Sequence, residues 1–271
     1  MTKKSTRLLS RLYMALIMFF LYAPILVLII FSFNSGKTQT KWQGFTLKWY
    51  EELFKDKELM PALSLSLEIA VLAAIISTII GVLAAIGLYK MNARLRSSIL
   101  AVNNIPIVNP EIVTGVSMLL LFLAMSSVIG NNILGYGTLL IAHITFCIPY
   151  VVLSILPKLR QLNPNTVEAA QDLGCPPVKA YFKVVIPEIM PGIITGAMIA
   201  FTLSLDDFVI SLFNKGNTMG TLAVVIYNKT KKPIKPSVNA LSALLFVAVI
   251  TLLVIINVIQ IRSQKRNEQK R

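Results

Sequence analysis

Long apolar stretches alternate with short polar segments along this 271-residue chain. An α-helix rises about 1.5 Å per residue, so about 20 apolar residues cross the hydrocarbon core of a bilayer, which is about 30 Å thick. The pattern predicts six transmembrane helices, at residues 12–33, 62–89, 99–126, 133–157, 188–212 and 238–261. The predicted fold class is therefore all-α, a polytopic membrane protein in which residues 1–271 form a single transmembrane domain.

Proline and glycine residues interrupt two of the predicted spans. Proline lacks an N–H group, so it kinks or breaks a transmembrane helix unless neighbouring groups pair the freed carbonyls. We therefore expect the third and fifth spans to be kinked or broken, which in a transporter permits gating and in a static protein only adjusts packing. The residues concerned are Pro106, Pro110 and Gly115 in the third span, and Pro191, Gly192 and Gly196 in the fifth.

Composition agrees with a membrane protein and changes the meaning of the charge. Hydrophobic residues make up 55% of the chain, above the usual range of soluble domains. A net charge of +14 would suggest nucleic acid binding in a soluble protein, but 16 of the 26 Lys and Arg residues lie on segments that are cytoplasmic if the N-terminus is inside. This bias predicts cytoplasmic N- and C-termini and no nucleic acid partner, although five basic residues between Lys215 and Lys235 weaken it.

The loop after the first span contains a short amphipathic segment, residues 46–54. Thr46 is a plausible helix N-cap, and Leu47, Tyr50 and Phe54, joined by Trp49 and Leu53, give an apolar side. Trp and Tyr side chains are enriched at membrane interfaces. The segment therefore predicts a helix that either lies on the bilayer surface or contacts a partner protein.

A polar segment at residues 164–187 separates the fourth span from the fifth. Asn163 can cap a helix that begins at Pro164, and Gly174 can end that helix in a left-handed conformation. A second short helix is expected to begin at Pro176–Pro177 and to stop before Pro187. The segment therefore predicts a charged helix-loop-helix outside the bilayer.

The segment contains Glu168-Ala169-Ala170, then Gly174, Phe182 and Pro187. With these offsets it resembles the EAA motif of ABC-importer permeases, although Ile186 replaces the usual Leu before the final Pro. In that family the motif forms a cytoplasmic coupling helix that docks into a groove on an ATPase, so the resemblance implies the same role here. The alternative is an ordinary cytosolic connector with a well-capped helix. The expected coupling residues are Glu168, Ala169, Ala170, Asp172, Gly174, Phe182 and Pro187.

Four acidic residues fall within the lipid zone of the predicted spans, namely Glu68, Glu111, Asp206 and Asp207. A charge within the bilayer is costly, so an intramembrane acid is a candidate functional residue. No Lys or Arg lies within the spans to neutralise them, which points to a cationic ligand in the outer half of the bilayer. Adjacent residues differ by about 100° around a helix, so one of Asp206 and Asp207 can face a pathway while the other caps or pairs locally. The alternative is that these acids are hydrated structural groups at the interface.

The string FTLSLDDFVIS (201–211), the EAA motif and the span spacing together resemble the PotC-type permeases of spermidine/putrescine ABC importers. That resemblance covers nearly the whole chain and implies the type I ABC-importer permease fold in a bacterial cytoplasmic membrane. It also implies a heterodimer with a homologous permease, two ATPase subunits that hold ATP and Mg, and an extracytoplasmic polyamine-binding protein. Import would proceed by alternating access.

The motifs of nucleotide binding and hydrolysis are absent from the sequence. Gly216 and Gly220 are not followed by the Lys of a phosphate-binding loop, so neither catalysis nor a cofactor is expected in this chain. The sole histidine, His143, has no metal-ligating companions and is interpreted as a packing residue. Two alternatives stay open: a permease for another cationic or small polar solute such as an amino acid, thiamine or iron, and a channel or membrane enzyme.

Overall fold

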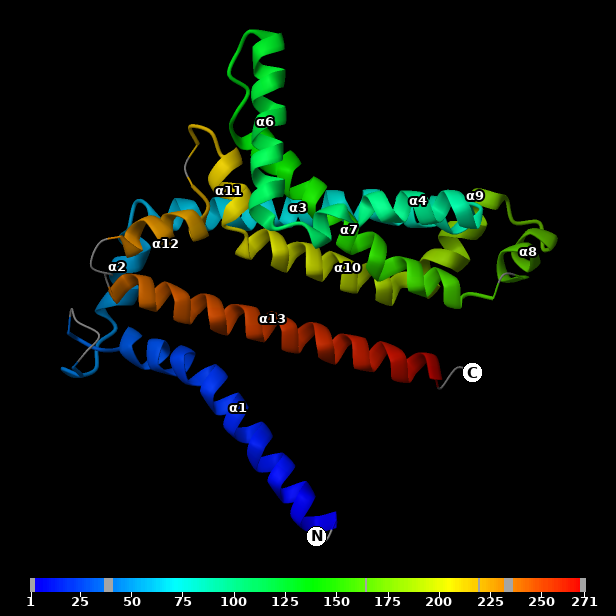
Figure 1. Ribbon diagram of the computed structural model, residues 1–271. Coiled ribbons are helices and arrows are strands. Elements are labelled where there is room, and N and C mark those ends of the chain that lie inside the picture. The colour runs from blue at the N-terminus through cyan, green and yellow to red at the C-terminus, as the bar shows by residue number, and fades with distance from the viewer. Residues whose placement is uncertain (1–2, 37–40, 164, 219, 232–235, 269–271) are drawn as a thin grey trace. The chain divides into compact units, whose positions relative to one another are not determined.

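The computed structural model describes residues 3–36, 41–163, 165–218, 220–231 and 236–268 (Figure 1). Apart from an isolated bridge between Asn34 and Phe45, these residues form helices and their connections, so the all-α prediction is confirmed. The elements are α1 (Lys3–Ser32), α2 (Lys48–Lys55), α3 (Leu59–Lys90), α4 (Ala93–Asn103), α5 (Ile105–Val108), α6 (Glu111–Ile129), α7 (Tyr136–Gln161), α8 (Asn165–Asp172), α9 (Pro177–Ala180), the π-helix η1 (Tyr181–Val185), α10 (Ile186–Asp206), α11 (Val209–Asn214), α12 (Leu222–Thr230) and α13 (Pro236–Glu268).

Five helical segments within the described residues are long and apolar enough to cross a membrane, which makes the chain a multi-pass membrane protein. They are Ser10–Ser32, Leu59–Lys90, Glu111–Ile129, Tyr136–Gln161 and Pro177–Asp206. The sixth predicted span, 238–261, coincides with α13. Its apolar stretch with described side chains runs from Pro236 to Thr251, and the rest of that prediction falls on side chains that the structure does not describe.

The chain divides into two compact units, one formed by residues 1–60 with 226–271 and the other by residues 61–225. In the first unit, α13 packs against both α1 and α2. Trp49 and Leu53 are the buried side chains of α2, and the indole N–H of Trp49 donates to the backbone oxygen of Asn34 at 2.6 Å. Leu47 and Phe54, which were expected on the apolar face, are instead exposed. The prediction that Thr46 is the N-cap is wrong, because Leu47 occupies that position and makes no side-chain cap bond. Thr46 lies one residue earlier, and its hydroxyl accepts from the N–H of Lys48.

Three charged side chains of the first unit link α12 to the connection between α2 and α3. Lys229 Nζ lies 2.7 Å from Glu58 Oε2 and 3.5 Å from Asp56 Oδ2. Burial alone would lower the pKa of Lys229, but its hydrogen bond to Glu58 and the attraction of both carboxylates raise it above the usual value. Burial likewise opposes ionisation of Asp56, yet the N–H groups of Glu58 and Leu59 and the charge of Lys229 hold its pKa below the usual value.

The second unit is built on close packing between α7 and α10, which lie side by side (Figure 1). Gly192 and Gly196 of α10 make this approach possible. A Cβ atom at Gly192 would lie 2.9 Å from Lys158 Cγ and 3.0 Å from the carbonyl oxygen of Ser154, both on α7. The glycines predicted to bend the fifth span therefore serve to bring two backbones together.

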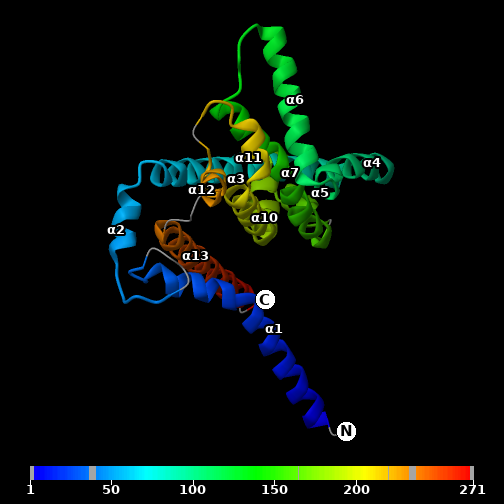
Figure 2. The same ribbon diagram turned by 60° about the vertical axis from the view of Figure 1, so that its left-hand side comes forward.

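The third predicted span is broken, as its prolines indicate. The chain forms α4 and then the single turn α5, and it resumes as α6 only after Pro110. In both views α6 points in a different direction from α4 (Figure 2). Glu111 is consequently the first residue of a helix, and it does not lie inside a continuous span over 99–126.

The fifth predicted span breaks at a different place from the one its proline indicates. The α10 helix continues through Pro191 and ends at Asp206, and α11 starts at Val209. The prediction that a helix stops before Pro187 is also wrong, because α9 runs through η1 into α10 without interruption. Pro187 lies in the first turn of α10. The wider π turn directly before it changes the backbone hydrogen bonds, so the N–H group that proline lacks is not needed there.

Replacement of Gly192 by Ala is expected to destabilise the protein by about 1–3 kcal/mol, because the methyl group has no room against α7. Gly87 is the matched control, since nothing lies within 4 Å of a Cβ atom built there. Gly87→Ala should stabilise α3 by up to about 1 kcal/mol through helix propensity. Thermal unfolding in detergent measures both changes, and equal shifts for the two variants would contradict the packing role of Gly192.

Candidate functional site

The acids predicted to form a pathway differ in their environments. Glu68 on α3, Glu111 at the start of α6 and Asp206 at the end of α10 are exposed. Asp207 is 7% exposed and lies in the break between α10 and α11. Three of the four carboxylates are thus available to a ligand from outside the chain, and the fourth is engaged within it.

Glu68 has a specific partner on the opposite helix. The hydroxyl of Tyr136, the first residue of α7, donates to Glu68 Oε1 at 2.7 Å. This bond orients one carboxylate oxygen and leaves the other free to accept. An exposed carboxylate held beside a phenol ring is a suitable environment for an ammonium group, which gains hydrogen bonds from the first and a cation–π contact from the second.

Asp207 caps the short helix that follows it. Its Oδ1 accepts from the N–H of Ile210 at 3.1 Å, and its Oδ2 accepts from the N–H of Ser211 at 2.7 Å. These N–H groups are unpaired at a helix start, and a carboxylate is well suited to accept from them. Asp207 is therefore the local capping member of the pair, and Asp206 is the exposed one.

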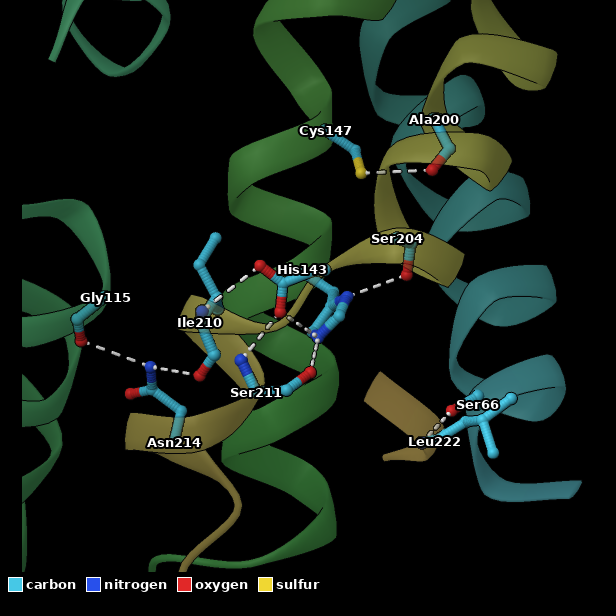
Figure 3. Close-up of polar contacts among 11 residues, drawn as sticks. Ser66, Gly115, His143, Cys147, Ala200, Ser204, Ile210, Ser211, Asn214 and Leu222 are labelled. Atoms are coloured by element: carbon cyan, nitrogen blue, oxygen red, sulfur yellow. Dashed lines mark hydrogen bonds and ion pairs between the residues drawn. The ribbon is translucent and has the colours of Figure 1, made fainter. Parts of the chain in front are cut away.

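His143, on α7, lies against the same break (Figure 3). Its Nδ1 is 2.7 Å from Ser204 Oγ, and its Nε2 is 3.1 Å from Ser211 Oγ and 3.6 Å from Asp207 Oδ2. The ring is fully buried and both nitrogens have partners. His143 is thus a satisfied interior histidine, as the sequence indicated, but its partners are specific polar groups on α10 and α11.

The far end of α11 is fixed to α6 and α7. Asn214 Nδ2 donates to the carbonyl oxygen of Gly115 on α6 at 3.2 Å, and Thr138 of α7 donates its hydroxyl to the carbonyl oxygen of Asn214. A Cβ atom at Gly115 would lie 3.3 Å from the ring of Phe213. In both ribbon views α11 lies beside α6 (Figure 2), and Figure 3 shows the Asn214–Gly115 link.

The polar residues around Asp207 were not identified from the sequence. Ser204, Asp207 and Ser211 are spaced by three and four residues within an apolar stretch, which is the spacing of one helix face. That spacing was the feature of the sequence from which a shared polar cluster could have been predicted. Their common partner could not be found in this way, because His143 lies 61 residues before Ser204.

The first helix of the polar segment 164–187, α8, is capped at Asn163 and ended at Gly174 as its sequence predicts. The carbonyl and side chain of Asn163 accept from the N–H groups at the start of α8, and Gly174 has a left-handed φ of 81°. Gly174 donates to Gln171 and Cys175 donates to Ala170, the two bonds of a Schellman C-cap. Pro164, predicted at the first helical position, lies outside the described residues.

One face of α8 lines a cavity of about 290 Å³ between this helix and the ends of α3, α7 and η1. Glu168 and Gln171 contribute to its wall, together with Tyr89 of α3 and Tyr181 of η1. Three apolar side chains of the polar segment 164–187 are instead exposed, with Leu173 at 90% and Val178 and Phe182 at 68% each. Three exposed apolar groups on a polar segment are typical of a surface that binds another protein.

The chain matches the family described as "Binding-protein-dependent transport system inner membrane component" over residues 77–270. It is 43% identical to the putrescine transport system permease protein PotI of Escherichia coli (strain K12) over 233 residues, covering 85% of this chain and 83% of that protein. It is 38% identical to the spermidine/putrescine transport system permease protein PotC of the same strain, covering 89% of each chain. The corresponding protein PotC of Haemophilus influenzae is 37% identical over 243 residues.

Solved structures share the fold. A bacterial alginate ABC transporter in complex with alginate pentasaccharide-bound periplasmic protein contains a chain that superimposes with a TM-score of 0.72 at 19% identity, covering 94% of this chain and 93% of that one. A second structure, of a bacterial ABC transporter involved in the import of alginate, gives 0.68 at 16% identity. At this identity the likeness concerns the fold alone.

Replacement of Asp207 by Ala is expected to cost about 1–3 kcal/mol of stability, because it leaves two buried N–H groups without an acceptor. Asp206→Ala, one residue earlier and exposed, should change stability by less than about 0.5 kcal/mol. Thermal unfolding of the purified protein in nanodiscs distinguishes them. A larger loss for the Asp206 variant would contradict the capping role of Asp207.

Proposed function

The chain belongs to the family of binding-protein-dependent transport system inner membrane components, and we propose that it is the permease subunit of an ATP-driven importer for polyamines such as putrescine and spermidine. The observation that carries this proposal is its 43% and 38% identity to PotI and PotC over most of its length. It is a transport subunit, and it is not an enzyme.

Carboxylates that face outward from the helices support a cationic substrate. Polyamines carry several ammonium groups, and each forms short, charge-assisted hydrogen bonds with a carboxylate. We assign Glu68, Glu111 and Asp206 to direct contact, since all three are exposed, and we assign Asp207 a supporting position through the cap of α11. An acidic polysaccharide would be repelled by this set, so the substrate of the alginate transporters does not carry over.

The proposed assembly contains a homologous permease as the second half of a heterodimer, two ATPase subunits and an extracytoplasmic polyamine-binding protein. In this assembly the EAA segment, residues 164–187, faces the cytoplasm and both termini lie on the same side of a bacterial cytoplasmic membrane. ATP and Mg are held by the ATPase subunits. Closure of those subunits moves the EAA segment, and the permease pair then alternates between outward and inward access.

The contact with the ATPase is proposed to combine the motif with its exposed apolar neighbours. Helix α8 contains Glu168, Ala169, Ala170 and Asp172, and Gly174 follows its end. The exposed side chains of Leu173, also after α8, and of Phe182, in the π turn, belong to the same segment. Burial of a Leu or Phe side chain contributes about 1.5–3 kcal/mol, so Leu173 and Phe182 can supply much of the affinity. Pro187 then lies where the segment joins α10.

Removal of a pathway carboxylate is expected to slow uptake. Asp206→Asn or Glu111→Gln should reduce ATP-driven uptake of spermidine about tenfold or more, because a hydrogen bond to a charged group contributes about 1.5–3 kcal/mol. Radiolabelled uptake into proteoliposomes that contain the whole complex measures the rate. Glu188→Gln is the matched control, since Glu188 is an exposed acid in the first turn of the same helix as Asp206, and its uptake should stay at the native rate. Native uptake by the Asp206, Glu111 and Glu68 variants alike would refute the proposed pathway.

Loss of the exposed apolar side chains should weaken ATPase binding. Leu173→Ser and Phe182→Ser are each expected to lower the affinity for the ATPase subunit about tenfold, through the lost burial of apolar surface. Titration of the labelled ATPase onto the permease pair in nanodiscs measures this affinity. Val128→Ser is the control, because Val128 is equally exposed but lies near the end of α6. If all three variants bind alike, the docking surface lies elsewhere.

A further inference from the structure

The exposed acids Asp206 and Glu111 lie on two helices, α10 and α6, that are both connected to α11. Asp206 is the last residue of α10, and α11 begins three residues later. Glu111 is the first residue of α6, and Gly115, one turn further along, is held by Asn214 at the end of α11. The position of α11 therefore sets the distance between the end of α10, which carries Asp206, and the start of α6, which carries Glu111.

The connection from α10 to α11 depends on one imidazole ring. His143 reaches Ser204 in the last turn of α10 through Nδ1, and it reaches Ser211 in the first turn of α11 through Nε2 (Figure 3). The ring thus links the two helices across the break, beside the cap that Asp207 forms on α11. A polar network in which every member has a partner makes such a junction rigid.

The hydrogen bonds around the ring define a consistent arrangement of protons. Asp207 already accepts two backbone N–H groups, and its Oδ2 lies 3.6 Å from Nε2 of His143. The tautomer protonated at Nε2 places its hydrogen toward Ser211 and Asp207 and leaves Nδ1 to accept from the Ser204 hydroxyl. This assignment gives each of the four side chains a partner.

We propose that His143 is a positioning residue for substrate selection, which holds α10 and α11 so that Asp206 stands at a fixed spacing from Glu111. The ring is fully buried and acts through Ser204, Ser211 and Asp207, without touching the substrate. Polyamines differ in the distance between their ammonium groups, so a fixed spacing between two carboxylates favours one chain length over another. This inference rests on the proposed function, because it assumes that Asp206 and Glu111 bind the amines.

The test compares two amines in the same complex. Native and variant permeases are reconstituted with their partners, and uptake is measured with one binding protein saturated in turn with putrescine and with spermidine. His143→Leu is expected to change the ratio of the two rates by about threefold or more, the size of a modest coupling between neighbouring groups. A merely structural defect would slow both amines equally and leave the ratio unchanged, and that result would overturn the proposal.

Three further variants keep the test decisive. Ser204→Ala removes one half of the bridge and should shift the ratio in the same direction, while Ser204→Thr retains the hydroxyl and should restore the native ratio. If His143→Leu fails to assemble, Ser204→Ala carries the test on its own. Cys147→Ala is the matched control: Cys147 is one turn from His143 and also bonds α10, at Ala200, but ahead of the break, so the native ratio is expected.

A double variant separates this inference from the proposed function. With Asn at position 206, the His143→Leu substitution should no longer alter the ratio, because the group that it positions has lost its charge. If the His143 and Asp206 substitutions change the ratio of the two rates independently, so that their effects multiply in the double variant, the positioning role is overturned. If Asp206→Asn by itself leaves uptake and the ratio at native values, the proposed pathway fails, whatever the His143 variants show.

Discussion

A break between two helices leaves N–H and carbonyl groups that need partners, and a buried group left without one costs free energy. In this protein the break between α10 and α11 is satisfied by one carboxylate and one imidazole, those of Asp207 and His143. The carboxylate accepts the free N–H groups of α11, and the imidazole spans the gap between the helices. Much of the second unit depends on this junction, since α11 in turn packs on α6.

The close packing of α7 with α10 connects the two ends of the second unit. At one end these helices meet in the His143 cluster, and at the other they lead into the capped helix α8 and the π turn η1. Gly192 and Gly196 remove the side chains that would otherwise separate the two backbones. The two helices are therefore packed as one unit, which joins the polar segment 164–187 at one end and carries Asp206 at the other.

Local rules predicted the parts of this structure that depend on local sequence. The cap at Asn163 and the left-handed Gly174 follow from short-range chemistry, and Pro110 marks the start of α6 as its missing N–H requires. Prediction failed at Pro187, because the π turn before it admits a proline where a regular helix would end. For α2 the predicted apolar side was too broad: Leu53 is buried as expected, whereas Leu47 and Phe54 are exposed. Packing that the segment's own sequence does not contain makes this distinction.

The separate roles of Asp206 and Asp207 show a different limit. Their adjacency indicated that they face different ways, but the sequence could not say which one is buried, since that is decided by a histidine on another helix. The partners of His143 were hidden for the same reason. The family resemblance, in contrast, was visible from the motif alone, because a spacing of residue types survives where long-range contacts cannot be inferred.

The cavity beneath α8 has a mechanical consequence. Because part of one face of α8 borders this cavity, the helix is held mainly by the supports at its two ends. Those supports are Asn163, which continues α7, and the α9–η1 turn, which continues α10. A displacement of α8 would therefore act on α7 and α10 through these two connections.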